Sequence, residues 1–127
     1  METAEQQAQA QLDSIVQMMA ALRTARCDKE REAVRTSIEE DPLSVEVRGD
    51  WHAPGGERAK PSEFMILLCT GGPAVRIRGG LDRYSEPEEP RIEYQDWFMP
   101  WRQLLGLTDK EHDALLDYCR QFYFGDA

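Results

Sequence analysis

The sequence predicts an α+β fold: a four-stranded, mostly antiparallel sheet in a meander, with helices packed on it in the order ααββββαα. Near both ends of the chain, apolar residues recur at three- and four-residue steps, as they do in amphipathic helices. Between these ends, short apolar or alternating segments typical of strands are separated by Gly- and Pro-containing turns. We expect one domain, with a helical segment over 1–41, the sheet over 43–97 and helices over 98–127.

The N-terminal segment predicts two helices. The first covers residues 3 to about 25, where one face collects apolar side chains. That stripe is interrupted around Cys27, so we expect a second helix with Asp28 as its N-cap, ending near Glu40 before Pro42. The apolar residues of the first helix are Leu12, Ile15, Val16, Met19 and Leu22.

Four segments predict the strands of the sheet. Residues 43–48 alternate between apolar and polar, as a half-buried strand does. Residues 63–70 are continuously apolar, which favours a central strand covered on both faces. Gly71-Gly72 then predicts a tight turn into a partner strand over 75–81. A fourth strand is expected over 91–95, after a charged loop.

The C-terminal segment predicts two further helices. Pro100 suits the first turn of a helix and Gly106 suits its exit, so we expect a short helix over 100–105. Thr108 and Glu111 have the spacing of a capping box, which would open a last helix.

Composition restricts the classes of function. Twenty-four acidic residues against fifteen basic residues give a net charge of −9, which repels nucleic acid and anionic membranes and favours basic partners. No apolar stretch approaches the roughly 20 residues that span a bilayer, and the first residues are polar, unlike a secretory signal. Three widely spaced cysteines fit a reducing compartment. We therefore expect a cytoplasmic protein that binds neither membranes nor nucleic acid directly.

Histidine, cysteine and acidic residues, the types that carry catalysis, are present, but their spacing in the sequence matches no catalytic or metal-binding motif. His52 and His112 lie 60 positions apart with no cysteine at ligand spacing, so we expect no metal site. Cys69 ends the most apolar strand and is expected to act as a small hydrophobe. We expect no catalytic or cofactor-binding residues. The alternative is a small-molecule-binding or enzymatic domain in which Thr70, Asp96 and His112 converge on a pocket.

Two tryptophans near the end of the fourth strand have two interpretations. Trp97 and Trp101 are four residues apart and would share one face if the short helix began early. They would then plug the corner between strand and helix, as large side chains often do. If they are exposed instead, they are anchors for a protein partner.

Acidic residues gather in two places, around the second helix and in the loop before the fourth strand. The simpler interpretation is a solvated face. The functional interpretation is a surface that imitates the nucleic-acid backbone and occupies a basic groove of a partner, releasing its counterions. On that hypothesis the candidate binding residues are Glu30, Glu39, Glu40, Asp41, Asp82, Glu86, Glu88 and Glu89, together with Trp97 and Trp101.

The stretch ILLCTGGPAVRIRGGLDRYSEPEEPRIEYQDWFMPW, with the ending LLDYCRQFYFG, resembles a family of short proteins encoded by temperate bacteriophages and prophages of proteobacteria. The resemblance covers about residues 63–125, and it brings no catalytic residue with it. Small acidic phage proteins without enzyme motifs are often inhibitors of host machinery. The resemblance therefore implies a non-enzymatic inhibitor of anti-CRISPR or anti-restriction type, which binds a host protein complex with a basic nucleic-acid-binding surface.

A third hypothesis is an oligomeric phage assembly module. The strand over 63–70 is apolar on both faces, and the helices could cover only one. Met65, Leu67 and Cys69 would then need a second layer, either from the N-terminal helices or from a second copy in a homodimer.

Overall fold

The structure is a computed structural model that describes residues 3–57 and 60–125. Three helices and five strands follow one another along the chain in the order ααβββββα. They are α1 (Ala4–Thr24), α2 (Asp28–Glu40), β1 (Ser44–Gly49), β2 (Pro61–Cys69), β3 (Ala74–Leu81), β4 (Pro87–Gln95), β5 (Arg102–Gln103) and α3 (Asp109–Cys119).

The five strands form one antiparallel sheet in the order β1-β2-β3-β4-β5, so each strand pairs with its neighbour in the chain. This confirms the α+β class and the antiparallel meander. The turn between β2 and β3 falls at Gly71-Gly72, as the sequence predicts. Gly71 has a φ of 117°, a conformation that other residues rarely adopt.

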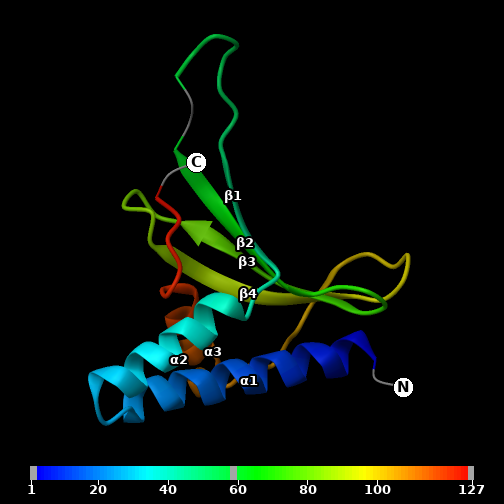
Figure 1. Ribbon diagram of the computed structural model, residues 1–127. Coiled ribbons are helices and arrows are strands. Elements are labelled where there is room, and N and C mark those ends of the chain that lie inside the picture. Colours follow the sequence, from blue (N-terminus) through cyan, green and yellow to red (C-terminus); the bar gives the residue numbers. More distant parts are fainter. Residues whose placement is uncertain (1–2, 58–59, 126–127) are drawn as a thin grey trace.

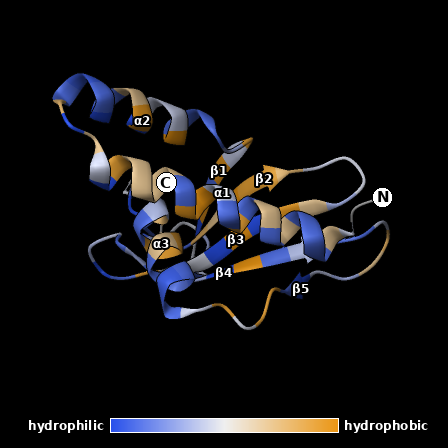
Figure 2. Cartoon of the chain, turned by 90° about the horizontal axis from the view of Figure 1, so that it is seen from below, coloured by the Kyte–Doolittle hydropathy of each residue, from blue (hydrophilic) through white to orange (hydrophobic). Residues whose placement is uncertain are grey.

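The helices lie on one face of this sheet. Figure 1 shows α1 and α3 below the strands, while the β1–β2 hairpin reaches away from the helices. Figure 2, seen from the helix side, shows α1 and α3 across the sheet and α2 beyond it on the β1 side. The core fills the space between the layers. Its fully buried residues include Leu12 and Ile15 of α1, Ile66, Ile77 and Ile92 of the sheet, and Leu115 and Tyr118 of α3.

The expectation that β2 is covered on both faces is wrong. Its residues alternate: Phe64, Ile66 and Leu68 are buried under the helix layer, whereas Met65 and Leu67 are half-buried on the opposite face. With all helices on one side, that second face stays open, as is common for antiparallel sheets. We call it the open face.

The predicted short helix over 100–105 is also wrong, and β5 occupies that segment. Arg102 and Gln103 pair with β4, and the Leu104 N–H donates to the Ile92 carbonyl at 2.8 Å. Six residues are too few for a stable isolated helix. Pairing with the edge of β4 satisfies the backbone and places Leu104 in the core.

Helix starts follow the sequence closely. Thr108 caps α3 in a capping box with Glu111, as predicted. In α2 the N-cap position is Cys27, one residue before the predicted Asp28, and its side chain makes no capping hydrogen bond. The Glu30 carboxylate reaches back past this position and accepts a hydrogen bond at 2.8 Å from the N–H of Arg26, the residue before the N-cap.

In the part of the chain that the structure describes, no helix combines the length and the apolar character needed to cross a membrane.

Candidate protein-binding surface

The segment after β4 is held in one conformation by hydrogen bonds at both ends. The Asp96 side chain accepts from the Ala4 N–H, the first residue of α1, at 3.3 Å. Its carbonyl accepts from the Met99 N–H at 3.1 Å. The Gln95 side chain donates to the Met99 carbonyl at 2.8 Å. These contacts fix the turn on the end of the sheet and on the start of α1.

Between these contacts the turn presents three large apolar side chains to solvent, and we call Trp97, Phe98 and Met99 the aromatic tip. Their exposed fractions are 67%, 99% and 47%. Phe98 has a φ of 59°, a left-handed conformation that is rare for a bulky residue. The ring gains no burial within the chain in return for this strain. Strained positions of this kind concentrate at functional sites.

Trp97 and Trp101 do not share a face, because the segment between them is a turn and not a helix. The Trp97 ring lies against the β2–β3 turn, where a Cβ added to Gly72 would come within 3.0 Å of its Nε1. Trp101 is half-buried on the open face, with the Arg76 guanidinium 3.8 Å from its ring centroid. Neither tryptophan is the buried corner plug of the simpler interpretation, and only Trp97 belongs to the aromatic tip.

Of the acidic residues predicted around α2, two have structural roles within the chain. Glu30 accepts a hydrogen bond from the Arg26 N–H just before the helix, and Asp41 accepts one from the buried Tyr118 hydroxyl at 2.7 Å. The side chains of Glu39 and Glu40 are exposed and make no hydrogen bond or ion pair with other described residues. They remain open to a partner.

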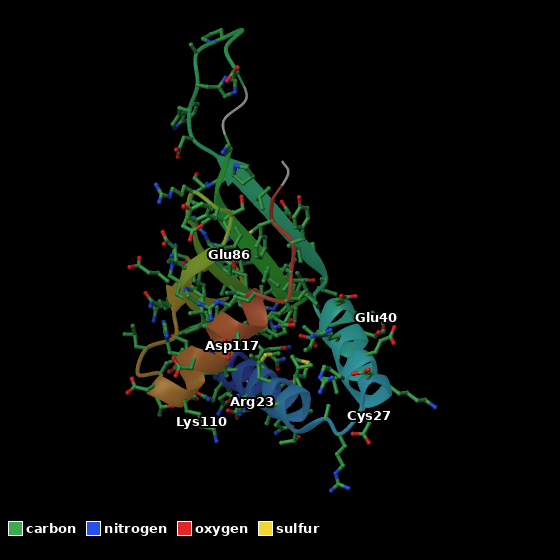
Figure 3. The ribbon with its side chains drawn as sticks, turned by 90° about the vertical axis from the view of Figure 1, so that its left-hand side faces the viewer. Arg23, Cys27, Glu40, Glu86, Lys110 and Asp117 are labelled. Carbon is green, nitrogen blue, oxygen red and sulfur yellow. The ribbon has the colours of Figure 1, made fainter. Side chains whose placement is uncertain are left out.

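The second predicted acidic group surrounds the β3–β4 turn. Asp82 shapes this turn, because its Oδ1 accepts from the N–H groups of Tyr84 and Glu86 at 2.8 and 3.0 Å. Figure 3 shows Glu86 and Glu40 well apart, so the two predicted acidic groups come from separate parts of the surface. Exposed carboxylates of this turn and of the start of β4 are Glu86, Glu88 and Glu89.

A third acidic group was missed from the sequence, and it lies where α1 meets α3. The Gln9 side-chain amide donates to Asp13 Oδ1 and to Glu111 Oε2, both at 3.0 Å. Hydrogen bonds from the Thr108 N–H and from Gln9 lower the pKa of Glu111, so its charge is retained. Glu5 lies one turn before Gln9 on the same helix. We call Glu5, Asp13 and Glu111 the α1–α3 acidic cluster.

The α1–α3 acidic cluster adjoins the aromatic tip. Glu5 lines a shallow hollow together with Asp96 and Met99. The sequence contains a signal for two of the three members: Glu5 and Asp13 lie four residues to either side of Gln9 and so share a face of α1. Its proximity to Glu111, about a hundred positions away, comes only from the packing of α1 on α3.

Charge is distributed unequally between the two layers. The three helices carry eleven acidic and five basic residues, whereas the five strands carry five of each. On the open face, Glu63 pairs with Arg48 and Arg78, and Glu93 pairs with Arg76 and Arg91. The acidic excess of the molecule therefore resides mainly on the helix layer and the turns.

Thr70, Asp96 and His112, the residues of the enzymatic alternative, each have separate surroundings in the structure. Asp96 binds the start of α1, His112 is exposed on α3 and Thr70 is exposed after β2. No hydrogen bond joins the three within the described residues.

Burial raises the pKa of the Cys69 thiol, and its side chain lies beside Gln7 and Gln11 of α1. Across residues 3–57 and 60–125, no group of three or more His, Cys, Asp or Glu side chains could hold a metal ion.

Comparison with known proteins found no matching family model, no similar curated protein and no similar solved structure.

Proposed function

We propose that this protein is a non-enzymatic, phage-encoded inhibitor that acts in the cytoplasm of the host bacterium. It would bind a protein of a nucleic-acid-handling defence system, of the CRISPR or restriction type, and block its basic groove. The observation that carries the proposal is the aromatic tip, which is exposed to solvent and held by hydrogen bonds at both ends of its turn, beside an acidic cluster.

The aromatic tip supplies the anchor. Trp, Phe and Met are enriched at protein interfaces, and a few buried aromatic residues usually carry most of the binding free energy. Burying a side chain such as Phe98 contributes about 2 kcal/mol. Because the turn is fixed by Asp96 and Gln95, little conformational entropy is lost on binding.

The acidic helix layer favours binding to a basic partner. Carboxylates held in place on a helix surface attract a groove lined by Lys and Arg, as the phosphates of nucleic acid do. The lowered pKa of Glu111 keeps one member of the α1–α3 acidic cluster ionised at neutral pH. Glu39 and Glu40 add exposed charge at the end of α2.

The phage context rests on the resemblance of residues 63–125 to small phage and prophage proteins. The aromatic tip falls within that stretch, whereas α1 lies outside it. On this proposal, the anchor belongs to the resembling part of the chain and much of the acidic surface is particular to this protein.

The proposal is tested with a panel of purified CRISPR effector complexes and restriction endonucleases. We expect at least one to bind the protein, in competition with its DNA, with an affinity that falls as NaCl is raised. Phe98→Ala should weaken this binding by roughly tenfold or more. The matched control is Leu105→Ala, which truncates another exposed apolar residue outside the tip.

Three double variants locate the acidic contact. Glu5→Gln with Asp13→Asn tests the α1–α3 acidic cluster, and Glu39→Gln with Glu40→Gln tests the end of α2. The control pair removes the same charge at Glu46 and Glu57, which lie outside both groups. An affinity that does not change with NaCl concentration would contradict the proposal. So would an equal loss of affinity in all three double variants, or a panel in which no protein binds.

A further inference from the structure

The centre of the open face, which is turned away from the helices in Figure 1, carries a row of ion pairs across the sheet. In this row each of two carboxylates bridges two guanidinium groups. Four positive charges against two negative charges leave two positive charges that no carboxylate of the row balances. We call this row the arginine ladder, and its members in order are Arg48, Glu63, Arg78, Arg91, Glu93 and Arg76.

The two unbalanced charges meet in the middle of the arginine ladder. Arg78 of β3 and Arg91 of β4 lie directly opposite each other, a position in which like charges destabilise a strand pair. Their ion pairs are long, at 3.6 Å from Arg78 to Glu63 and 3.4 Å from Arg91 to Glu93. Their side chains are only 24% and 35% exposed, so water covers a minor part of them. The alternation of charge therefore lacks one negative group, between Arg78 and Arg91.

Two further carboxylates lie on the open face, at its margins. Glu46 is on the edge strand β1, and Glu88 follows the β3–β4 turn opposite Gly80. Both are exposed and form no ion pair with other residues that the structure describes. The gap between Arg78 and Arg91 is thus left without a carboxylate that bridges the two.

The surroundings of Glu63 show that this part of the sheet stabilises negative charge. A hydrogen bond from Arg48 lowers the pKa of Glu63, and the charges of Arg78 and Arg91 lower it further. This holds although the whole molecule has a net charge of −9, because its acidic excess lies mainly on the helix layer and the turns. Salt screens exposed charges over about 10 Å.

A hollow of about 260 Å³ adjoins the gap on the open face. Arg78 forms part of its wall, and Arg76 reaches across it, with Nη1 3.8 Å from the Met65 sulfur. Pockets for drug-sized ligands measure about 300–1,000 Å³, so this hollow suits a smaller molecule. Its other lining side chains include Glu46, Arg48 and Glu63.

We propose that the open face binds the phosphate group of a small phosphorylated molecule, between Arg78 and Arg91. Guanidinium groups donate paired hydrogen bonds to phosphate oxygens. A phosphate monoester carries a charge of about −1.5 to −2 at neutral pH, which matches the two unbalanced charges, whereas a carboxylate balances one. The rest of the molecule lies in the hollow against Met65. This site shares no residue with the aromatic tip or the helix layer, so it is independent of the proposed function.

Titration of ¹⁵N-labelled protein, followed by amide chemical shifts, tests the proposal with three probes at equal ionic strength: glycerol 3-phosphate, inorganic phosphate and acetate. We expect both phosphates to shift the amides around Arg78 and Arg91, and acetate to bind roughly tenfold more weakly or less. Arg91→Gln should raise the dissociation constant of both phosphates roughly tenfold or more. Arg120→Gln, which removes an ion-paired arginine of α3, is the matched control and should leave it unchanged.

Met65→Ala separates a phosphorylated molecule from free phosphate as the occupant. It should weaken the binding of glycerol 3-phosphate and leave that of inorganic phosphate unchanged, because only the former reaches the hollow. An equal effect on the two probes would overturn the assignment of the hollow.

Thermal unfolding gives a second readout that also verifies that the variants are folded. Phosphate should raise the midpoint of the wild type above its value in NaCl of equal ionic strength, since a ligand of the folded state stabilises it. Arg91→Gln should lose most of this gain, and Arg120→Gln should keep it. An equal gain in wild type and Arg91→Gln would overturn the proposal, because phosphate would then act as a general stabilising salt. Equal affinity for phosphate and acetate would overturn it as well.

Discussion

Gly79 shows how one atom limits the packing of this core. A Cβ at this position would lie 2.7 Å from Cε1 of Phe64 and 3.0 Å from the Glu88 carbonyl oxygen. The Phe64 ring cannot move away freely, because it packs on Phe124 with ring centroids 4.8 Å apart. We expect Gly79→Ala to lower the free energy of unfolding by about 1–3 kcal/mol in urea titrations.

Gly80 is the matched control for that substitution. Its added Cβ would have ordinary contacts, the nearest at 3.6 Å, on the Glu88 side chain. Gly80→Ala should therefore change stability far less than Gly79→Ala. Equal effects of the two substitutions would show that strand propensity, and not the Phe64 contact, decides the outcome.

Phe98 is the residue at which stability and binding are expected to oppose each other. Its left-handed backbone costs about 1–2 kcal/mol for a residue with a Cβ, and glycine avoids that strain. Phe98→Gly should leave the midpoint of thermal unfolding unchanged or raise it, while binding to the partner is lost. Met99→Gly is the comparison, because Met99 has no positive φ, and it should lower the midpoint. A lower midpoint for Phe98→Gly would refute the strain argument.

At the scale of elements, the Tyr118–Asp41 hydrogen bond ties α3 to the end of α2. Burial, and then Asp41, raise the pKa of Tyr118 far above its ordinary value, so the hydroxyl stays protonated and donates. Tyr118→Phe should lower the free energy of unfolding by about 1.5–3 kcal/mol, as expected for a hydrogen bond to a charged group. Tyr84→Phe, at an exposed tyrosine, is the control, and a similar loss there would contradict this account.

The capping box of α3 predicts a stability that depends on pH. Thr108→Ala should lower the free energy of unfolding by about 1 kcal/mol, as measured by urea titration. Thr70→Ala, at an exposed threonine, is its control.

Glu111 has a pKa below its ordinary value, so its stabilisation is complete above the unfolded-state pKa and is lost as pH falls through the folded-state pKa. The stability difference between wild type and Glu111→Gln should therefore shrink between neutral and strongly acidic pH. A constant difference would refute this linkage.

At the scale of the whole molecule, the net charge of −9 predicts a response to salt. Repulsion within the acidic helix layer is screened by added ions, while the ion pairs at the surface contribute little. We expect the midpoint of thermal unfolding to rise when NaCl is increased from about 20 mM to about 500 mM. The Glu39→Gln and Glu40→Gln pair should respond less. A falling midpoint would show that the Arg–Glu pairs of the open face outweigh the repulsion.

Local chemistry explains which parts of the fold the sequence predicted. The Gly71-Gly72 turn, the Thr108–Glu111 capping box and the stripe of Leu12, Ile15 and Met19 each depend on residues a few positions apart. Their hydrogen bonds and faces are set by backbone geometry alone. The helices, the hairpin turn and the antiparallel order follow from such signals.

The features that escaped prediction depend on distant partners. Arg102 and Gln103 become a strand only because β4 offers them an open edge. Trp97 is exposed because the turn after β4 is held by the start of α1, through Asp96. Of the predicted acidic residues, Asp41 proved to accept a hydrogen bond from Tyr118, which lies in α3 far along the chain. Glu30 and Asp82 are the exceptions, because the backbone N–H groups that they bind belong to residues close by in the sequence.

The sequence by itself therefore determined the class of fold, the helix starts, the hairpin turn and the acidic balance of the surface, since these depend on composition and short-range spacing. The tertiary structure decided which face of the sheet stays open, and that the aromatic tip is exposed beside the α1–α3 acidic cluster. Each of these depends on residues far apart in the chain, whose meeting is set by the packing of the helix layer on the sheet.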